Sequence, residues 1–500
     1  MSNSGNCGGA LPHHRLYVAG EWREGRGGRR FNAINPYTAR PWATVAQAEH
    51  EDVNAAIACA RAAFEGVWSR MNGYERSGLL MKLADLLQND AERMGRLEST
   101  DNGKIIRETH TQMVLAARQY RFFAGYADKL WGQQIPLDQR DVFDYATREP
   151  LGVVALLTAW NSPLGLLANK LAPALAAGNC VVIKPSEHTS VTTLEFCRLV
   201  QAAGFPAGVV NVVCGAADVG RALVEGAVDK VSFTGSAAVG REIAAAAGRR
   251  LVPVTLELGG KSPNIIFADA NLERAVVGAL AGIFGATGQT CVAGSRLLVQ
   301  RSVHDRVVEA LTARARAVRL GDPLDPSTDM GTAANEPQFH RILGFIERAR
   351  ADGARAVAGG GAARGAGLEQ GFFVEPTIFA DVRNEMEIAQ EEVFGPVLAV
   401  IPFGDEEEAV RIANASRYGL AAGVWTENLS RALRVTRALR VGQVWVNTYR
   451  SLAVQTPFGG FKDSGFGREK GQQALDEYLA SKNIMVDFSN AQRDPFALRT

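Results

Sequence analysis

From residue 151 onward, short apolar runs alternate with helical segments about every 25 residues, and this rhythm restricts the fold more than any other feature. The apolar runs resemble strands buried on both faces: they are 151–159, 181–184, 209–213, 230–233 and 252–256. The helical stretches between them are 163–177, 189–203, 218–226 and 237–247. Parallel strands joined by helices form a doubly wound sheet, which binds ligands beyond the carboxyl ends of its strands. The sequence therefore predicts an α/β nucleotide-binding domain.

A second alternating series begins near Ser262 and predicts a second α/β domain from about residue 260. Its strands are expected at 264–267, 296–300, 397–401 and 423–425, with helices at 272–284 and 303–318. Before residue 151, apolar residues recur at helical spacing over 51–88, and more helix is expected over 113–130. Residues 16–48 form a polar lead-in, and residues 1–14 are expected to be a disordered tail.

Charge and cysteine content exclude several classes of protein. Lysine plus arginine number 54 and aspartate plus glutamate 53, so the net charge of +1 predicts no nucleic-acid partner. The apolar runs are too short to span a membrane, and the first residues do not resemble a signal peptide. The six cysteines are scattered, without a C-x-x-C pair, which argues against a zinc or disulfide scaffold. We expect a cytoplasmic protein without a metal site.

The usual phosphate-binding motifs are missing. There is no G-x-G-x-x-G, and Gly260-Lys261-Ser262 is not a P-loop because Thr255 stands where that motif needs a glycine. The segment Gly235–Gly240 follows a strand and opens a helix, so its backbone N–H groups could bind an anion. Most turns of this kind are only structural.

Three residues could carry chemistry. Cys291 lies in a glycine-rich loop between a helix and a strand, whereas most of the other cysteines lie in apolar segments that predict burial. Glu257 closes the strand 252–256, so its carboxylate is expected at the ligand-binding edge of the sheet. Asn161 follows another strand of that sheet and could donate to an oxyanion. A solvated loop acid and a helix-capping Asn remain alternatives for the last two.

Five segments together resemble the NAD(P)-dependent aldehyde dehydrogenases. They are Ala159–Pro163, Glu257–Pro263, Gly288–Cys291, Glu392–Pro396 and Pro457–Gly465. Their order and spacing agree with the family, including the 34 residues between Glu257 and Cys291, and the resemblance runs from about residue 15 to 488.

The resemblance implies a catalytic role for five residues. Cys291 would attack the aldehyde carbon, and Asn161 with the Cys291 backbone N–H would stabilise the oxyanion of the hemithioacetal. Glu257 would activate the water that hydrolyses the thioester left after hydride transfer. Lys170 and Glu469 match positions linked to proton relay, although a structural ion pair is an equal alternative.

The resemblance also implies NAD as cofactor. Lys184 and Glu187 would hold the adenosine ribose, and the negative charge of Glu187 favours NAD over NADP, because it repels a 2′-phosphate. Glu392 and Phe394 would position the nicotinamide ribose and ring. The remaining cofactor positions are Trp160, Gly235, Ser236 and Leu258, with the pyrophosphate near Ser236.

In this family the substrate enters a tunnel, and the chain departs from many relatives there. The matching positions are Ser162, Leu166, Asn169, Thr290, Val292, Leu452 and Phe458. Three of them, Ser162, Asn169 and Leu452, replace frequent aromatic residues, which predicts a wider and partly polar tunnel without an aromatic cage for a quaternary ammonium. Arg450 could meet a polar or anionic end of the substrate, or it could be structural.

The family architecture implies three parts. The NAD-binding domain would comprise 15–130 and 151–259, and the catalytic domain 260–470. An oligomerisation arm of residues 131–150 and 471–500 would include a strand at 480–488. An unpaired edge strand is normally covered by another subunit, so a homodimer or homotetramer is expected.

Three other functions stay open. A CoA-acylating relative would transfer the acyl group to CoA, but such relatives often lack the glutamate found here as Glu257. A non-catalytic binding or structural protein on the same fold would have no need of Cys291, Glu257 and Asn161. Hydrolysis of esters by the same thiol is expected only as a side activity.

Overall fold

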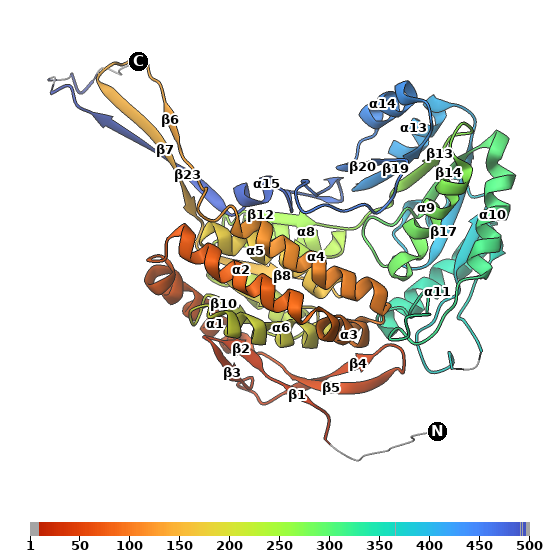
Figure 1. The fold of residues 1–500 in the computed structure, drawn as a ribbon, viewed down its shortest axis with the longest axis horizontal. Coiled ribbons are helices and arrows are strands. Elements are labelled where there is room, and N and C mark those ends of the chain that lie inside the picture. The colour runs from red at the N-terminus through yellow and green to blue at the C-terminus, as the bar shows by residue number, and fades with distance from the viewer. Residues whose placement is uncertain (1–9, 366, 491, 493, 497–500) are drawn as a thin grey trace.

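The structure is a computed structural model that describes residues 10–365, 367–490, 492 and 494–496. Two α/β units lie side by side, and a long β arm extends away from them (Figure 1). Each unit is built on its own sheet, so the predicted α/β class is confirmed.

The first unit contains an eight-stranded sheet whose five central strands are parallel. In spatial order the strands are β22 (Gly465–Phe466), β12 (Val254–Glu257), β11 (Lys230–Thr234), β8 (Val153–Leu157), β9 (Cys180–Lys184), β10 (Val210–Val212), β2 (Leu16–Val18) and β3 (Glu21–Arg23). The five parallel strands are those that the apolar runs predicted. The edge strand β22 comes from a segment that the sequence assigned to the other domain. Its two residues are too few to show any periodicity.

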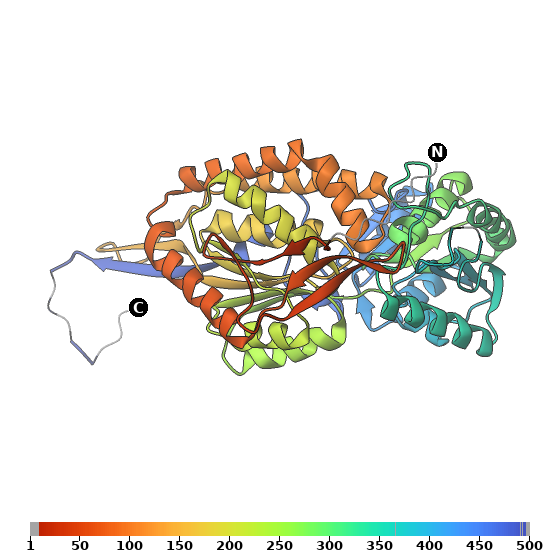
Figure 2. The same cartoon turned by 90° about the horizontal axis from the view of Figure 1, so that it is seen from below.

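Helices cover both faces of this sheet (Figure 2). One face carries α1 (His50–Ala63), α7 (Ala217–Glu225) and α8 (Ala237–Gly248). The other carries α5 (Pro163–Ala177) and α6 (Ser190–Ala203), with α2 (Gly73–Asn89), α3 (Ala91–Asn102) and α4 (Ile106–Ala124) packed outside them.

Local sequence sets the ends of these helices. Helix α5 begins at Pro163, where the missing N–H costs nothing, and it ends before Gly178, whose φ of 97° a residue with a side chain rarely adopts. The stretch 51–88 is not one helix, because a π-helical turn at Phe64–Trp68 follows α1 and Asn72 caps a new helix by accepting from Glu75.

The second unit contains a seven-stranded sheet in which every neighbouring pair is parallel except β15 and β16. In spatial order its strands are β15 (Arg355–Ala358), β16 (Thr377–Ala380), β17 (Val397–Phe403), β14 (Arg296–Gln300), β13 (Pro263–Ile266), β19 (Ala421–Trp425) and β20 (Gln443–Val446). Its helices are α9 (Leu272–Phe284), α10 (His304–Arg316), α11 (Glu336–Ala351), α12 (Glu387–Gln390), α13 (Glu406–Asn414) and α14 (Leu429–Ala438).

The polar lead-in is largely β structure. Strand β1 (His13–His14) pairs with β5 (Arg40–Ala46), which also pairs with β4 (Arg30–Asn35). The predicted disordered tail of residues 1–14 is therefore wrong for His13 and His14, while residues 1–9 lie outside the described part of the chain. Short polar strands of this kind lack the apolar run by which strands are recognised in a sequence.

The arm is a three-stranded antiparallel sheet of β6 (Gln133–Ile135), β7 (Val142–Pro150) and β23 (Leu479–Asp487). Strand β23 pairs with β7 along its whole length, from Leu479 opposite Pro150 to Asp487 opposite Val142. Large apolar side chains on and beside the arm face solvent, among them Trp131, Met485 and Phe488, which are 77%, 63% and 61% exposed.

Near the first unit's edge, a smaller pair of strands, β18 (Tyr418–Gly419) and β21 (Phe461–Lys462), precedes β22, and α15 (Gln473–Asp476) leads to β23. Ser464 ties these segments together: its hydroxyl donates to the Gly259 carbonyl (2.7 Å) and accepts from the Gly419 N–H (3.0 Å). No helix in the described ranges combines the length and the apolar character needed to cross a membrane.

Candidate active site

Cys291 lies between the two units, in the loop that joins α9 to β14. A 3-10 turn at Gly285–Gly288 ends the helix, and the half-buried Cys291 follows. Its backbone lies against the Glu257–Gly260 segment so closely that a Cβ on Gly260 would be 2.4 Å from the Cys291 carbonyl oxygen. Glycine is therefore required at 260 for the two units to meet at this point.

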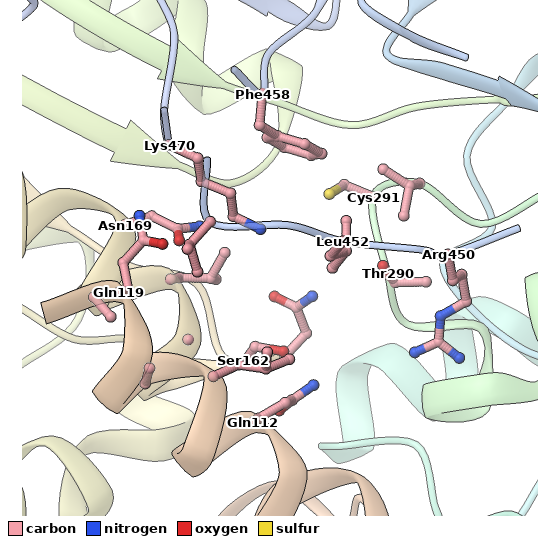
Figure 3. A pocket seen from close by; sticks show the side chains of 18 of the residues that line it. Gln112, Gln119, Ser162, Asn169, Thr290, Cys291, Arg450, Leu452, Phe458 and Lys470 are labelled. Carbon is pink, nitrogen blue, oxygen red and sulfur yellow. The ribbon is translucent and has the colours of Figure 1, made fainter. Parts of the chain in front are cut away.

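Two cavities meet at this residue. We call the first the substrate cavity, and Figure 3 shows its lining. The second, the cofactor cavity, is lined by residues including Trp160, Gly235, Ser236, Glu257, Leu258, Glu392 and Phe394. Cys291, Asn161 and Leu166 line both.

The surroundings of Cys291 keep its thiol protonated. Burial is the largest cause that raises the thiol pKa to about 12, and the negative charges of Glu257, Glu392 and Glu469 add to it. The ammonium of Lys470 acts in the opposite direction. Because only the thiolate is a strong nucleophile, this thiol needs a proton acceptor or additional positive charge before it can attack.

The other described cysteines are free, and most of them are structural. Cys180, Cys197 and Cys214 are fully buried, as the sequence predicted, and Cys59 is half-buried. Burial raises the pKa of both Cys180 and Cys214 to about 12. Unlike Cys291, these three lie in or beside the first sheet and line neither cavity.

Glu257 is the last residue of β12 and is 3% exposed. Neither of its carboxylate oxygens has a hydrogen-bond partner among the described residues. Burial raises its pKa well above the usual value, the nearby charge of Glu469 raises it further, and Lys170 lowers it. A raised pKa makes this carboxyl group a better proton acceptor than an ordinary glutamate, which suits a general base.

Lys170 and Glu469 form a buried ion pair beside Glu257. The Lys170 ammonium lies 2.5 Å from a Glu469 carboxylate oxygen and donates to the Ser232 hydroxyl at 3.1 Å. The two residues come from α5 and from the segment after β22, so the pair fastens that segment to the first unit. Such a pair fits either the structural or the relay interpretation.

Asn161 follows β8 and points its amide toward the loop of Cys291. Its side-chain nitrogen donates to the Gln289 carbonyl at 2.9 Å. Gln289 is itself held, because its amide donates to the Thr332 carbonyl and accepts from the Ala334 N–H. An amide nitrogen has two hydrogens, so Asn161 keeps one donor for a ligand in the cavity.

Beyond the cofactor cavity, a cleft runs over the carboxyl ends of β8, β9 and β11. Lys184 and Glu187 line it and form an ion pair with N and O atoms 3.6 Å apart. Ser236 caps α8 by accepting from the Val239 N–H. The hydroxyls of Thr158 and Thr234 also line the cleft and are buried without a hydrogen-bond partner among the described residues.

Glu392 and Phe394 lie on the opposite wall of the cofactor cavity. A Glu392 carboxylate oxygen accepts from the Gly260 N–H at 2.9 Å, and burial raises the Glu392 pKa to about 7. The Phe394 ring meets the Trp160 ring edge to face, with centroids 5.2 Å apart. A Cβ on Gly259 would lie 2.2 Å from the Glu392 carboxylate, so this approach also requires glycine.

All seven tunnel positions taken from the sequence line the substrate cavity. Among its lining residues in the described chain, Phe458 is the one aromatic side chain, in agreement with the predicted lack of an aromatic cage. Arg450 lines the cavity as well, but its guanidinium is 3.2 Å from Glu108, so it is already paired.

Sequence reasoning missed three polar residues of this cavity: Gln112, Gln119 and Lys470. A signal was present for two of them. Gln112, Leu115, Ala116 and Gln119 follow the spacing of one helix face, and all four line the cavity from α4. Two glutamines on an otherwise apolar face mark a polar site. For Lys470, adjacency to Glu469 was the only hint.

Comparisons with known proteins agree along nearly the whole chain. Residues 22–484 match the model of the aldehyde dehydrogenase family. An aldehyde dehydrogenase of Aspergillus niger is 44% identical over 479 residues, 95% of each chain, and the rat protein "aldehyde dehydrogenase, cytosolic 1" is 44% identical over 96% of each. A betaine aldehyde dehydrogenase from Staphylococcus aureus, crystallised with NAD⁺, has a TM-score of 0.95 at 40% identity, covering 97% of each chain. An NAD⁺ complex of an aldehyde dehydrogenase from Bacillus cereus has a TM-score of 0.93 at 43% identity, covering 95% of this chain and 97% of that one.

Proposed function

The chain belongs to the aldehyde dehydrogenase family, and on that premise we propose that it oxidises an aldehyde to the carboxylic acid with NAD through a covalent intermediate on Cys291. The observation that carries this proposal is the position of Cys291. It lies where a substrate cavity meets a cofactor cavity, and Asn161 and Glu257 line the cofactor cavity with it.

The first step is attack of the Cys291 sulfur on the aldehyde carbon. The thiol loses its proton to water, the S–C bond forms, and the carbonyl oxygen becomes negative. The free amide hydrogen of Asn161 and the Cys291 backbone N–H are the donors proposed for that oxygen. Because Gln289 fixes the orientation of Asn161, this donor is in place before the substrate arrives.

The cleft fits a dinucleotide. The unpartnered hydroxyls of Thr158 and Thr234 and the N-terminus of α8 offer donors, and Lys184 and Glu187 stand at its ribose end. We assign Glu392 and Phe394 to the nicotinamide end, with Trp160, Gly235 and Leu258 in the wall. When bound, NAD supplies the acceptor for the hydride that leaves the hemithioacetal carbon.

Hydrolysis of the resulting thioester is assigned to Glu257. Its carboxylate takes a proton from a water molecule, the hydroxide adds to the thioester carbon, and the Cys291 sulfur leaves as the acid is released. The raised pKa of Glu257 supports this role, since such a group accepts the proton and later gives it up. The Lys170–Glu469 pair is the route by which we propose that this proton leaves.

A panel of aldehydes, incubated with NAD or NADP and followed by the absorbance of the reduced cofactor, tests this function. We expect NADH and one equivalent of free acid per aldehyde. Formation of acyl-CoA in the presence of CoA would instead identify the CoA-acylating alternative. Absence of reduced cofactor with every aldehyde would leave the non-catalytic alternative.

We also propose that the arm joins two or more copies of the chain into a homodimer or homotetramer. The exposed apolar side chains Trp131, Met485 and Phe488 support this, because water contact with them is unfavourable. Light scattering coupled to size-exclusion chromatography should give a mass of two or four chains. A mass of one chain would contradict the proposal.

The free cysteines support a reducing, cytoplasmic location.

A further inference from the structure

One wall of the substrate cavity carries polar side chains that none of the proposed steps uses. It comprises Gln119 from α4, Asn169 from α5 and Lys470 from the segment after β22, and we call it the polar wall. Figure 3 shows these three together on one side of the cavity, away from Arg450. They come from three separate parts of the chain, so the fold, rather than one local motif, brings them together.

Gln119 is 2% exposed, yet neither its amide nitrogen nor its amide oxygen has a hydrogen-bond partner among the described residues. Leaving a buried donor or acceptor unpaired costs about 1–3 kcal/mol, and here both ends of one amide are unpaired. Asn169 is half-buried and lines the same cavity. A buried amide without partners that lines a cavity indicates that a ligand completes it.

Lys470 adds a positive charge to this wall. Its ammonium forms no ion pair within the described chain, and the adjacent Glu469 is paired with Lys170. Its nearest aromatic contact is the Phe458 ring, 5.4 Å from the ammonium to the centroid. Lys470 has a φ of 58°, in the left-handed region that costs a side-chain-bearing residue energy, and such strain is concentrated at binding sites.

The cavity as a whole is positive. Arg450 and Lys470 line it, and no aspartate or glutamate is among its lining residues in the described chain. Glu108 pairs with Arg450, whereas Lys470 forms no ion pair with a described residue, although the charges of Glu469 and Glu257 lie near it. A neutral aldehyde would leave the Lys470 ammonium and the Gln119 amide without a ligand.

We propose that the substrate is an aldehyde that carries a carboxylate at its far end, a semialdehyde. This inference rests on the proposed function: the aldehyde carbon lies at Cys291, and the carboxylate lies at the polar wall. There it accepts from the Lys470 ammonium and from the amide N–H groups of Gln119 and Asn169. Charged hydrogen bonds are the strong ones, so Lys470 contributes most of the discrimination against uncharged aldehydes.

The test compares succinic semialdehyde with butanal, which has the same number of carbons but no carboxylate. The wild type should have the higher kcat/KM with succinic semialdehyde. Lys470→Met should lower that kcat/KM by roughly 10- to 100-fold and change the value for butanal less than about threefold. Gln119→Met should act in the same direction with a smaller effect, and Lys470→Arg should keep most of the preference. Lys82→Met, which removes an exposed lysine on α2, is the matched control and should change neither value.

Two results would overturn the inference. One is a wild-type preference for butanal. The other is an equal loss on both aldehydes in Lys470→Met, which would mean that Lys470 acts through the Cys291 thiol and not on the substrate.

Binding of succinate and of butan-1-ol, which has no carboxylate, separates this inference from the proposed function when measured by calorimetry. Succinate should bind more tightly, and Lys470→Met should remove the difference. If the enzyme oxidises no aldehyde but still binds succinate in this way, the proposed function fails and the polar wall stands. Equal binding of the two compounds by the wild type contradicts the proposed role of the polar wall.

Discussion

The two cavities that meet at Cys291 differ in the charge of the groups they bury. The cofactor cavity buries the carboxyl groups of Glu257 and Glu392, and burial raises the pKa of both. The substrate cavity has no carboxyl group in its described lining and carries Lys470 and Arg450 instead. Cys291 stands on the boundary, so the acids raise its thiol pKa and Lys470 lowers it.

Removing a charged group from water is costly, and the two cavities use such groups in different ways. A buried carboxyl group without hydrogen bonds, as in Glu257, exchanges protons readily, and this suits a general base. A half-buried ammonium that forms no ion pair with a described residue, as in Lys470, is better suited to attract an anion. Chemistry and recognition are thereby placed on opposite sides of one sulfur atom.

Cys291 lines both cavities, so replacing it should have the largest effect. We expect Cys291→Ala to lower kcat by at least about 10⁴-fold, because no other thiol is among the described lining residues of either cavity. Both cavities should keep their ligands, so NAD titration by fluorescence should give an unchanged Kd. Substantial turnover by the purified variant would show that the nucleophile lies elsewhere.

Glu257→Gln tests the cofactor cavity alone. Loss of a general base costs roughly 10²- to 10⁴-fold, and here the loss should fall on steady-state turnover. A first burst of NADH, near one equivalent per site, should remain, with an acyl group on Cys291 detectable by intact mass. Since only the ionised Glu257 accepts a proton, wild-type kcat should rise with pH through the raised pKa, and the variant should lack this rise. An unchanged steady state would make Glu257 a mere structural acid.

Glu187 places a further carboxylate in the cleft that adjoins the cofactor cavity. We expect NAD to be preferred over NADP, and Glu187→Ala to reduce the ratio of their kcat/KM values roughly 10- to 100-fold. Loss of a ribose hydrogen bond and of repulsion toward a 2′-phosphate both act in this direction. Glu225→Ala, which removes another acid of the same cleft, is the matched control. If the wild type uses both cofactors equally well, Glu187 does not contact the ribose.

The smallest effect concerns the thiol itself. Because its pKa is about 12, alkylation of Cys291 by iodoacetamide should accelerate with each unit of pH from 7 to 10. Glu257→Gln removes a negative charge that raises this pKa, so alkylation at a fixed pH should become a few times faster. A slower reaction in the variant would instead show that Glu257 takes the thiol proton.

The sequence predicted those parts of the fold that have a strong period. Helix α9 has the predicted bounds, and the five parallel strands of the first sheet end within two residues of the ranges expected from apolar runs. The strands β1 to β5 and β22 were missed, since they are short, polar or both. The pairing of β22 depends on β12, which lies far away in the chain, whereas β2 pairs with β3 and β4 with β5 locally.

The site shows the same limit. Family motifs located Cys291, Glu257 and Asn161, and the structure places them around the junction of two cavities. Their roles are proposals that the variants above test. Gln119 and Lys470 were missed because neither lies in a motif. Their significance comes from their surroundings. The side-chain amide of Gln119 has no hydrogen-bond partner, and Lys470 forms no ion pair, among the described residues.

The pairing of β22 with β12 also bears on how the enzyme is made. Phe458 and Lys470, which line the substrate cavity, both belong to the last tenth of the chain. The ribosome delivers the first sheet's parallel strands more than 190 residues earlier, and domains generally fold in the order of synthesis. A nascent or prematurely ended chain can therefore hold a nearly complete nucleotide-binding unit and still lack the wall beside its reactive thiol.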